Sequence, residues 1–163
     1  MSQATNKVAI VTGASRGIGA GIAERLARDK FAVIVNYSGS KAAADAVVQR
    51  IATGGGRAIA VQADVADAAA VSALFDAAEK AFGGVDVLVN NAGVMALRSI
   101  AESDDATFDR MIAINLKGTF NGMREAAKRL RTAAGSSICR PVWSAPSWKT
   151  TASMPQPRLP WRR

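Results

Sequence analysis

Short apolar runs alternate with longer amphipathic segments over the first 130 residues. The runs cover residues 8–11, 31–35, 58–61 and 85–89, and each is rich in Val, Ile, Ala or Leu. Between them, over 18–28, 41–52 and 68–82, apolar residues recur at the spacing of one helical face. A longer amphipathic segment begins at Asp104 or Thr107 and continues to about residue 130. The pattern predicts four strands that alternate with four helices.

The continuous apolar character of these strands indicates how they pack. Strands without polar alternation are typical of a parallel sheet that is covered on both faces. Helices of 10–16 residues join them, and such crossovers are right-handed in nearly all proteins. We therefore expect an α/β fold with a Rossmann-type, doubly wound parallel sheet, truncated after about four strands.

The composition changes abruptly near the end of the chain. All five Pro, all three Trp and the single Cys lie between residues 139 and 163, where neither helical nor strand periodicity is present. The first 130 residues hold fifteen of the 21 Lys and Arg and all thirteen Asp and Glu, so the last segment is basic without any acid. We expect an ordered body over 1–131 and an irregular basic tail over 132–163.

Composition also excludes several kinds of chemistry. The chain has no His, which excludes Ser-His-Asp and Cys-His catalysis and His-ligated metals, and one Cys cannot form a disulfide or a cysteine zinc site. We therefore expect no metal. The polar start and the short first apolar run do not form a secretory signal or a membrane span. We therefore expect a cytoplasmic protein that does not associate with a membrane.

Three glycines lie between the first predicted strand and the first predicted helix. Gly13, Gly17 and Gly19 have the spacing Gly-x3-Gly-x-Gly. A glycine-rich turn at this place lets the backbone approach a pyrophosphate, whose negative charge is favourable at a helix N-terminus. A tight strand-to-helix turn without a ligand is the alternative.

Three further polar motifs follow in order. Asp64 and Val65 lie at the end of the third predicted strand, and the sequence Asn-Asn-Ala-Gly, residues 90–93, follows the fourth. Asn115 lies inside the last helix, where Asn is less favourable than Ala by several tenths of a kcal/mol. Each has a structural alternative: ordinary turns for the first two motifs, and a satisfied polar side chain at a helix bend for Asn115.

In this order and spacing, the four motifs resemble those of the short-chain dehydrogenase/reductase family over residues 7–130. The resemblance implies an NAD(P)-dependent oxidoreductase. It also implies that Asp64 meets the adenine amino group, that the Asn-Asn-Ala-Gly segment holds the central sheet and lines the adenine-ribose side, and that Asn115 is a catalytic residue that bends its helix and relays protons through a water. The cofactor-binding residues that it implies are Gly13, Ser15, Arg16, Gly17, Ile18, Gly19, Asn36, Tyr37, Ser38, Asp64, Val65, Asn91, Ala92 and Gly93.

The segment after the second strand bears on the choice of cofactor. NAD enzymes usually have an acidic residue about 20 positions beyond the glycine-rich turn, where it holds the ribose 2′-hydroxyl. Here Asn36, Tyr37 and Ser38 occupy that place, and Arg16 could meet a 2′-phosphate. Lys41 could assist, although a solvated helix start explains it equally well. We therefore expect NADP(H) rather than NAD(H).

The family's chemistry uses further residues, which these 163 residues lack. It uses a Tyr that moves a proton, a Lys four positions later that lowers the pKa of that Tyr, and a Ser that orients the substrate carbonyl. Tyr37 is the only Tyr, and no Tyr-x3-Lys occurs. The resemblance implies NADPH-linked reduction of a small carbonyl, or oxidation of an alcohol, for a parent enzyme, and only Asn115 of the catalytic set is present. We expect a catalytically incomplete, dinucleotide-binding chain, prone to form homo-oligomers or aggregates.

Two other functions stay open. A non-catalytic module would use the dinucleotide as a regulatory ligand. A nucleic-acid-binding protein would use the basic tail, but that tail has no basic-aromatic spacing on a recognisable fold, so we rank it last.

The tail has an explanation in the genetic code. In a shifted reading frame, each new codon consists of the third base of one present codon and the first two bases of the next. One translation that the genetic code permits in this frame, from Thr132 onward, contains a fifth strand, a Ser and a Tyr-x3-Lys. That Tyr codon spans Ser153 and Met154, and the Lys codon spans Pro157 and Arg158. We interpret the tail as the out-of-frame translation of a catalytic segment; a selected basic tail is the alternative.

Overall fold

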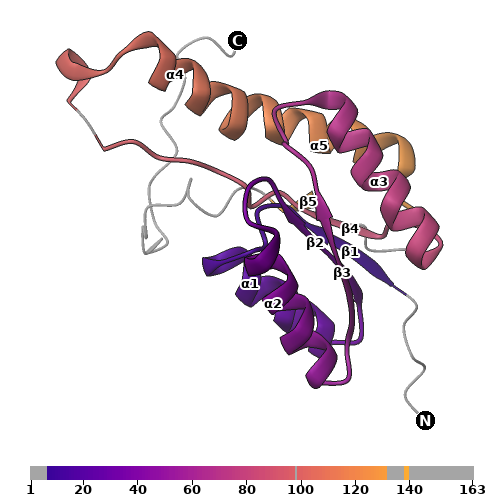
Figure 1. Ribbon diagram of the computed structural model, residues 1–163. Helices are drawn as coiled ribbons and strands as arrows, with labels where there is room; N and C mark the ends of the chain where they lie inside the picture. The colour runs from indigo at the N-terminus through magenta and orange to yellow at the C-terminus, as the bar shows by residue number, and fades with distance from the viewer. Residues whose placement is uncertain (1–6, 98, 132–137, 140–163) are drawn as a thin grey trace, which may run out of the picture.

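The strands form one parallel sheet, as the sequence predicts. The computed structural model describes residues 7–97, 99–131 and 138–139. In it, β1 (Val8–Val11), β2 (Ala32–Tyr37), β3 (Arg57–Gln62), β4 (Val87–Val89) and a short β5 (Ile138–Cys139) are ordered β3-β2-β1-β4-β5. Every pairing is parallel. The order runs outward from β1 in both directions (Figure 1), so the predicted Rossmann-type, doubly wound architecture is confirmed.

Helices cover both faces of this sheet. The helices α1 (Gly17–Arg28) and α2 (Lys41–Thr53) lie on one face, and α3 (Ala68–Phe82) and α5 (Gly118–Arg129) lie on the other (Figure 1). Val33 and Val35 of β2 pack in the core under α1 and α2, whereas Ile34 packs with Phe75 of α3 in the second core. Because both faces are covered, β1 and β2 are buried along their whole length, which explains their apolar sequences.

The bounds of two strands differ from the prediction by two residues at one end. The second strand, predicted over 31–35, continues to Tyr37 because β3 pairs with it along that length. The fourth strand, predicted from residue 85, begins only at Val87. Asp86 is buried, and its carboxylate accepts a hydrogen bond from the backbone N of Val8 at 2.7 Å and pairs with the guanidinium of Arg131. The carboxylate of Asp86 thus takes the N–H of Val8, while the backbone N of Asp86 still donates to the carbonyl of Val8 at 2.9 Å.

The last predicted helix contains a change of winding. Asp104 caps its start, since its carboxylate accepts a hydrogen bond from the backbone N of Thr107 at 2.6 Å. After the short η1 (Ile100–Glu102), the helix α4 (Asp105–Met111) leads into the π-helical turn η2 (Ile112–Lys117) and then into α5 without a break. The sequence predicts a helix here but not the π-helical turn, which contains Asn115.

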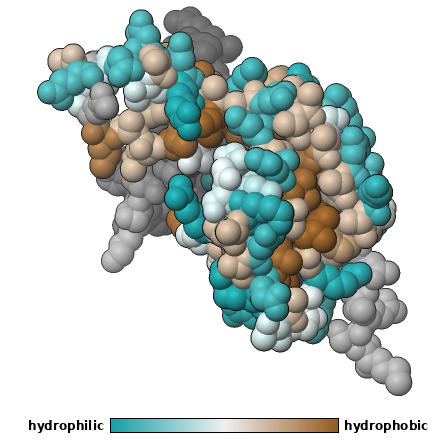
Figure 2. Space-filling model, viewed as in Figure 1, coloured by the Kyte–Doolittle hydropathy of each residue, from teal (hydrophilic) through white to brown (hydrophobic). Residues whose placement is uncertain are grey.

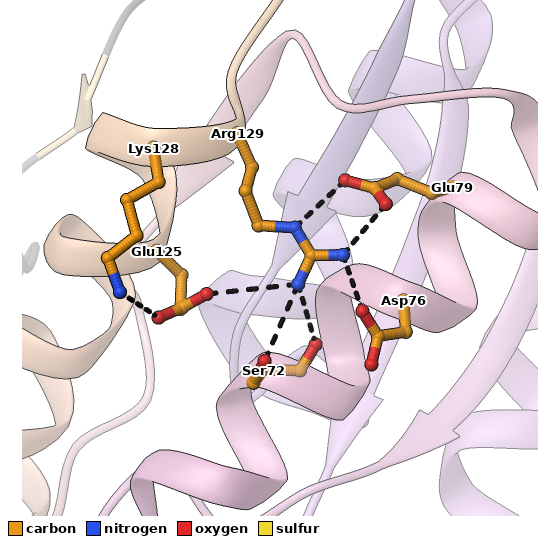
Figure 3. A network of polar contacts seen from close by, with 6 residues as sticks. All are labelled: Ser72, Asp76, Glu79, Glu125, Lys128 and Arg129. Carbon is orange, nitrogen blue, oxygen red and sulfur yellow. Dashed lines mark hydrogen bonds and ion pairs between the residues drawn. The ribbon is translucent and has the colours of Figure 1, made fainter.

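A polar network joins α3 to α5 (Figure 3). The guanidinium of Arg129 donates to both carboxylate oxygens of Glu79, at 2.9 and 2.7 Å, and to Asp76 and the carbonyl of Ser72. The hydrogen bond from Arg129 lowers the pKa of Glu79, and the same bond raises the pKa of Arg129. The network holds together the two helices that cover the second face.

The strand β5 lies in the segment predicted to be irregular. Ile138 and Cys139 pair with Leu88 and Val89 of β4, whose edge offers unpaired backbone groups to a parallel partner. The remainder of the predicted tail, 132–137 and 140–163, lies outside the described residues, and its boundary at 131 stays a prediction. Within the described ranges, no helix is long and apolar enough to cross a membrane.

Candidate functional site

A cleft of about 940 Å³ lies at the carboxyl ends of the strands, where the strand order changes direction at β1. Five segments that are distant in the sequence form its walls. All residues that the sequence predicts for cofactor contact line it, namely Gly13, Ser15, Arg16, Gly17, Ile18, Gly19, Asn36, Tyr37, Ser38, Asp64, Val65, Asn91, Ala92 and Gly93. The cleft also includes residues that the sequence did not single out: Gly39, Ser40, Ala43, Ala63, Ala66, Val94, Arg110, Ala113 and Ile114.

The glycine-rich turn requires glycine at two of its positions for different reasons. Gly13 has a φ of +62°, and a Cβ there would lie 2.8 Å from the Cα of Ala92. Gly19 has an ordinary φ, but a Cβ there would lie 2.5 Å from the carbonyl oxygen of Gly13. The backbone segments on both sides of the turn therefore approach each other too closely for a side chain, which brings the N-terminus of α1 to the cleft floor.

Thr12 and Asn91 tie this turn to the end of β4. The Nδ2 of Asn91 donates to the carbonyls of Thr12 and Gly13, at 2.9 and 3.1 Å. The hydroxyl oxygen of Thr12 accepts from the backbone N atoms of Asn91 and Ala92, at 2.9 and 3.0 Å, and donates to the carbonyl of Val89. The amide donor of Asn91 is therefore engaged within the protein, and the segment that follows β4 is fixed against the glycine-rich turn.

Asn36 lines the cleft through its position in the chain, but its side chain is engaged elsewhere. It is 1% exposed; its Oδ1 accepts from the backbone N of Gly13 at 3.1 Å, and its Nδ2 donates to the carbonyls of Val61 and Ala63 at 3.3 and 3.0 Å. Asn36 stands where an NAD enzyme usually has an acid, as the sequence indicates, and its side-chain bonds fasten the ends of β1, β2 and β3 together. Arg16, Ser38 and Ser40 are exposed polar residues of this part of the cleft.

Asp64 and Val65 lie beyond the third strand rather than at its end, because β3 stops at Gln62. The Oδ1 of Asp64 accepts from the backbone N of Ala66 at 2.9 Å, which closes a turn of the kind that Asp favours. Asp64 therefore both forms the turn that was the structural alternative and lines the cleft, as expected of a cofactor-binding residue.

Asn115 is not among the residues that line the cleft. Its Oδ1 accepts from the backbone N of Val94 at 2.8 Å, and its Nδ2 donates to the carbonyl of Val94 at 2.8 Å. The hydroxyl of Thr119 donates to the carbonyl of Asn115 at 2.8 Å. The side chain is thus satisfied within the π-helical turn and fixes Val94 in the wall of the cleft, and the catalytic role expected of Asn115 stays a prediction.

Some of the missed residues had a signal in the sequence. Ser40 precedes the second helix, and its hydroxyl accepts from the backbone N of Ala43 as an N-cap, a role that Ser commonly fills. Arg110 had none, since an Arg on an amphipathic helix ordinarily indicates a solvated face. Arg16, Asp64 and Arg110 are the charged residues that line the cleft.

Comparison with known proteins agrees with this geometry. The family model of the short chain dehydrogenases matches residues 7–140. An uncharacterized oxidoreductase of Methylorubrum extorquens is 50% identical over 130 residues, which is 80% of this chain and 52% of that protein. A 3-oxoacyl-(acyl-carrier-protein) reductase of Staphylococcus aureus is 45% identical over 133 residues, which is 81% of this chain and 54% of that protein.

Solved structures of the same kind share the fold. A short chain dehydrogenase of Burkholderia cenocepacia in complex with NADP has a TM-score of 0.74 and 43% identity, covering 78% of this chain and 52% of that one. A short-chain dehydrogenase/reductase of Serratia marcescens has a TM-score of 0.74 and 44% identity, covering 77% and 51%. The chain spans about half the length of the relatives it matches. On the extent of these matches and the geometry of the cleft, the chain belongs to the short-chain dehydrogenase family.

Proposed function

We propose that residues 7–131 bind NADP(H) in the cleft at the carboxyl ends of the strands. The observation that carries the proposal is the convergence of the glycine-rich turn, the N-terminus of α1 and the turns after β2, β3 and β4 on one cleft. The pyrophosphate would lie over the glycine-rich turn, where backbone N–H groups and the helix dipole favour an anion. The related Burkholderia cenocepacia structure contains NADP, which supports this assignment.

The preference for NADP(H) over NAD(H) follows from the charges around the adenosine end. Arg16 and Ser38 are both exposed and line the cleft, and residues 36–40 include no acid that would repel a 2′-phosphate. Lys41 is a poor candidate for this contact because its ammonium donates to Asp45 at 2.7 Å, a bond that raises the pKa of Lys41. Arg16 is therefore the proposed 2′-phosphate ligand.

The family consists of oxidoreductases, and we propose NADPH-linked carbonyl reduction as the parent activity. The cofactor, when bound, supplies or accepts the hydride. These 163 residues contribute its binding surface, and Asn115 orders the wall at Val94. Tyr37 is 5% exposed within β2, so it is not placed to exchange a proton with a substrate. We therefore propose that the polypeptide binds the dinucleotide without turnover.

Titration with each cofactor tests this proposal. Calorimetry on the 163-residue chain should give tighter binding of NADPH than of NADH, and Arg16→Glu should remove most of that preference. Arg25→Glu is the matched control, since Arg25 lies on α1 and pairs with Asp29 outside the cleft. Equal affinity for the two cofactors contradicts the assignment of Arg16, and the absence of binding contradicts the function itself.

An activity assay distinguishes the non-catalytic proposal from an enzyme. NADPH with a panel of ketones and acyl thioesters should be consumed no faster than in buffer. Turnover that Asn115→Ala abolishes would show that this chain is an enzyme in its own right. Tight binding without turnover fits both an incomplete reductase and a regulatory dinucleotide-binding module. Activity of a chain with the shifted reading frame restored beyond residue 131 would distinguish the first from the second.

We also propose that the chain self-associates through an apolar face of the long helix. Phe108, Leu116 and Phe120 are 56%, 64% and 53% exposed, and Ile112 and Met123 extend the same row. Brown side chains lie among teal ones along this helix in the upper part of Figure 2. An exposed apolar row of this length favours association. A concentration-dependent sedimentation coefficient is expected, and a strictly monomeric chain would contradict the proposal.

A further inference from the structure

The helix that fixes Val94 on one wall of the cleft also contacts the turn after β3. Asn121 of α5 is 2% exposed, and its Nδ2 donates to the carbonyl of Val65 at 3.0 Å and to that of Ala66 at 3.4 Å. Val65 and Ala66 line the cleft together with Asp64. A buried side chain outside the cleft thus holds two backbone carbonyls of its wall.

The hydrogen bonds that Asp64 makes within this turn are local. The carboxylate of Asp64 accepts from the backbone N of Ala66, and the carbonyl of Asp64 accepts from the backbone N of Asp67. These bonds shape the turn but do not attach it to another element. The amide of Asn121 attaches it to a helix more than 50 residues away in the sequence.

The packing of α5 requires this particular arrangement. Gly118 lies one turn before Asn121, and a Cβ at Gly118 would lie 2.6 Å from the Cγ2 of Val65, so the helix rests directly on the turn. Arg124 donates to the Oδ1 of Asn121 at 3.3 Å, which engages the other end of the amide and fixes its orientation. Only a short side chain with a donor at one end and an acceptor at the other satisfies all of these contacts.

We propose that Asn121 is a positioning residue for the adenine half of the dinucleotide. It fixes the turn from Asp64 to Ala66, while Asn115, six residues earlier in the same continuous helix, fixes Val94 on the other wall. One helix therefore sets the position of two walls, each through a single Asn side chain. This inference rests on the proposed dinucleotide binding.

The test uses the two halves of the cofactor as separate probes on the full chain. Asn121→Asp keeps the shape of the side chain but removes the donor, and Asn121→Ser is a milder second variant if the first does not fold. Adenosine 2′,5′-bisphosphate should bind about tenfold more weakly to either variant, which is the usual effect of losing one or two buried hydrogen bonds. Reduced nicotinamide mononucleotide should bind within about twofold of the unaltered chain.

A control separates positioning from general loss of stability. Glu79→Gln weakens the network between α3 and α5, away from the cleft, and should leave the affinity for both probes unchanged. Amide hydrogen exchange at Ala66 and Asp67 should become faster in the Asn121 variants and not in Glu79→Gln. Unchanged affinity for the bisphosphate, or equal weakening for both probes, overturns the inference alone. An unaltered chain that binds neither probe overturns the proposed function and this inference with it.

Discussion

Replacement of Gly13 by Ala is the most informative perturbation of the cleft. The residue has a φ of +62°, which costs an L-residue roughly 1–2 kcal/mol. The new Cβ would also lie 2.8 Å from the Cα of Ala92, which is backbone and cannot rotate away. Overpacking of this kind costs about 1–3 kcal/mol, so Gly13→Ala should lose roughly 2–5 kcal/mol of a total that is on the order of 5–15 kcal/mol.

Substitutions at two other glycines separate the conformational cost from the cost of overpacking. Gly17 has a φ of +58° but no atom within 4 Å of its Cβ position, so Gly17→Ala should show the conformational cost alone, about 1–2 kcal/mol. Gly21, in the interior of α1, has neither problem, and Gly21→Ala should stabilise the chain by roughly 0.5–1 kcal/mol. From most to least stable, the expected order is Gly21→Ala, the unaltered chain, Gly17→Ala and Gly13→Ala.

Urea unfolding monitored by circular dichroism measures these differences, and NADPH titration of each variant relates them to the cleft. Gly13→Ala should also bind NADPH more weakly, because relief of the contact with Ala92 displaces the segment that follows β4. Equal losses for Gly13→Ala and Gly17→Ala would refute the argument from close approach. A stabilised Gly17→Ala would refute the argument from φ.

Four other predictions follow from particular contacts. Asn36→Asp removes the donor to Val61 and Ala63, so it should lower the urea midpoint without raising the affinity for NADH; a gain in NADH binding would refute the inward orientation of Asn36. Arg129 lowers the pKa of Glu79, so the stabilisation from this pair should be fully present above the unfolded pKa of Glu, roughly 4.3, and should be lost as the pH falls through the lowered folded-state pKa. In urea titrations at several pH values, Glu79→Gln should therefore lose less stability on acidification than the unaltered chain, and an unchanged pH profile would contradict this. Leu116→Glu, on the exposed apolar row, should increase the monomer fraction in sedimentation, and unchanged association would place the interface elsewhere. The gene should encode Ser and Tyr-x3-Lys in the shifted frame beyond residue 131, and restoring that frame should yield an NADPH-dependent reductase; early stop codons in that frame would refute the frameshift.

Local patterns in the sequence were sufficient for the fold. The apolar runs of β1 and β2 identify buried strands because both faces of the sheet are covered. Asp104 identifies the start of α4 because its side chain caps the helix two to three residues away. Contacts within a few residues decide both features, so periodicity and capping rules predict them. The glycine spacing placed the cleft for the same reason, since Gly13 carries its own backbone requirement.

The directions of individual side chains could not be predicted in this way. Asn36 bonds to residues 23 to 27 positions away, and Asn115 to Val94 at a separation of 21, so their partners become known only when the strands and helix are assembled. The π-helical turn and the strand β5 depend likewise on tertiary contacts, with Val94 and with β4 respectively. Asn121 gave no signal, because a single Asn on a helix face is ordinarily a surface residue.

The proposed function places a dinucleotide in the cleft at the carboxyl ends of the strands. Nitrogen-15 NMR of the 163-residue chain, recorded during addition of NADPH, tests it most directly. If NADPH binds in this cleft, the largest shifts occur at the backbone amides of residues 13–19, 64–66 and 91–94, and they saturate at a lower concentration of NADPH than of NADH. Shifts centred on the helices α2 and α3, or no saturable shifts at all, would contradict it.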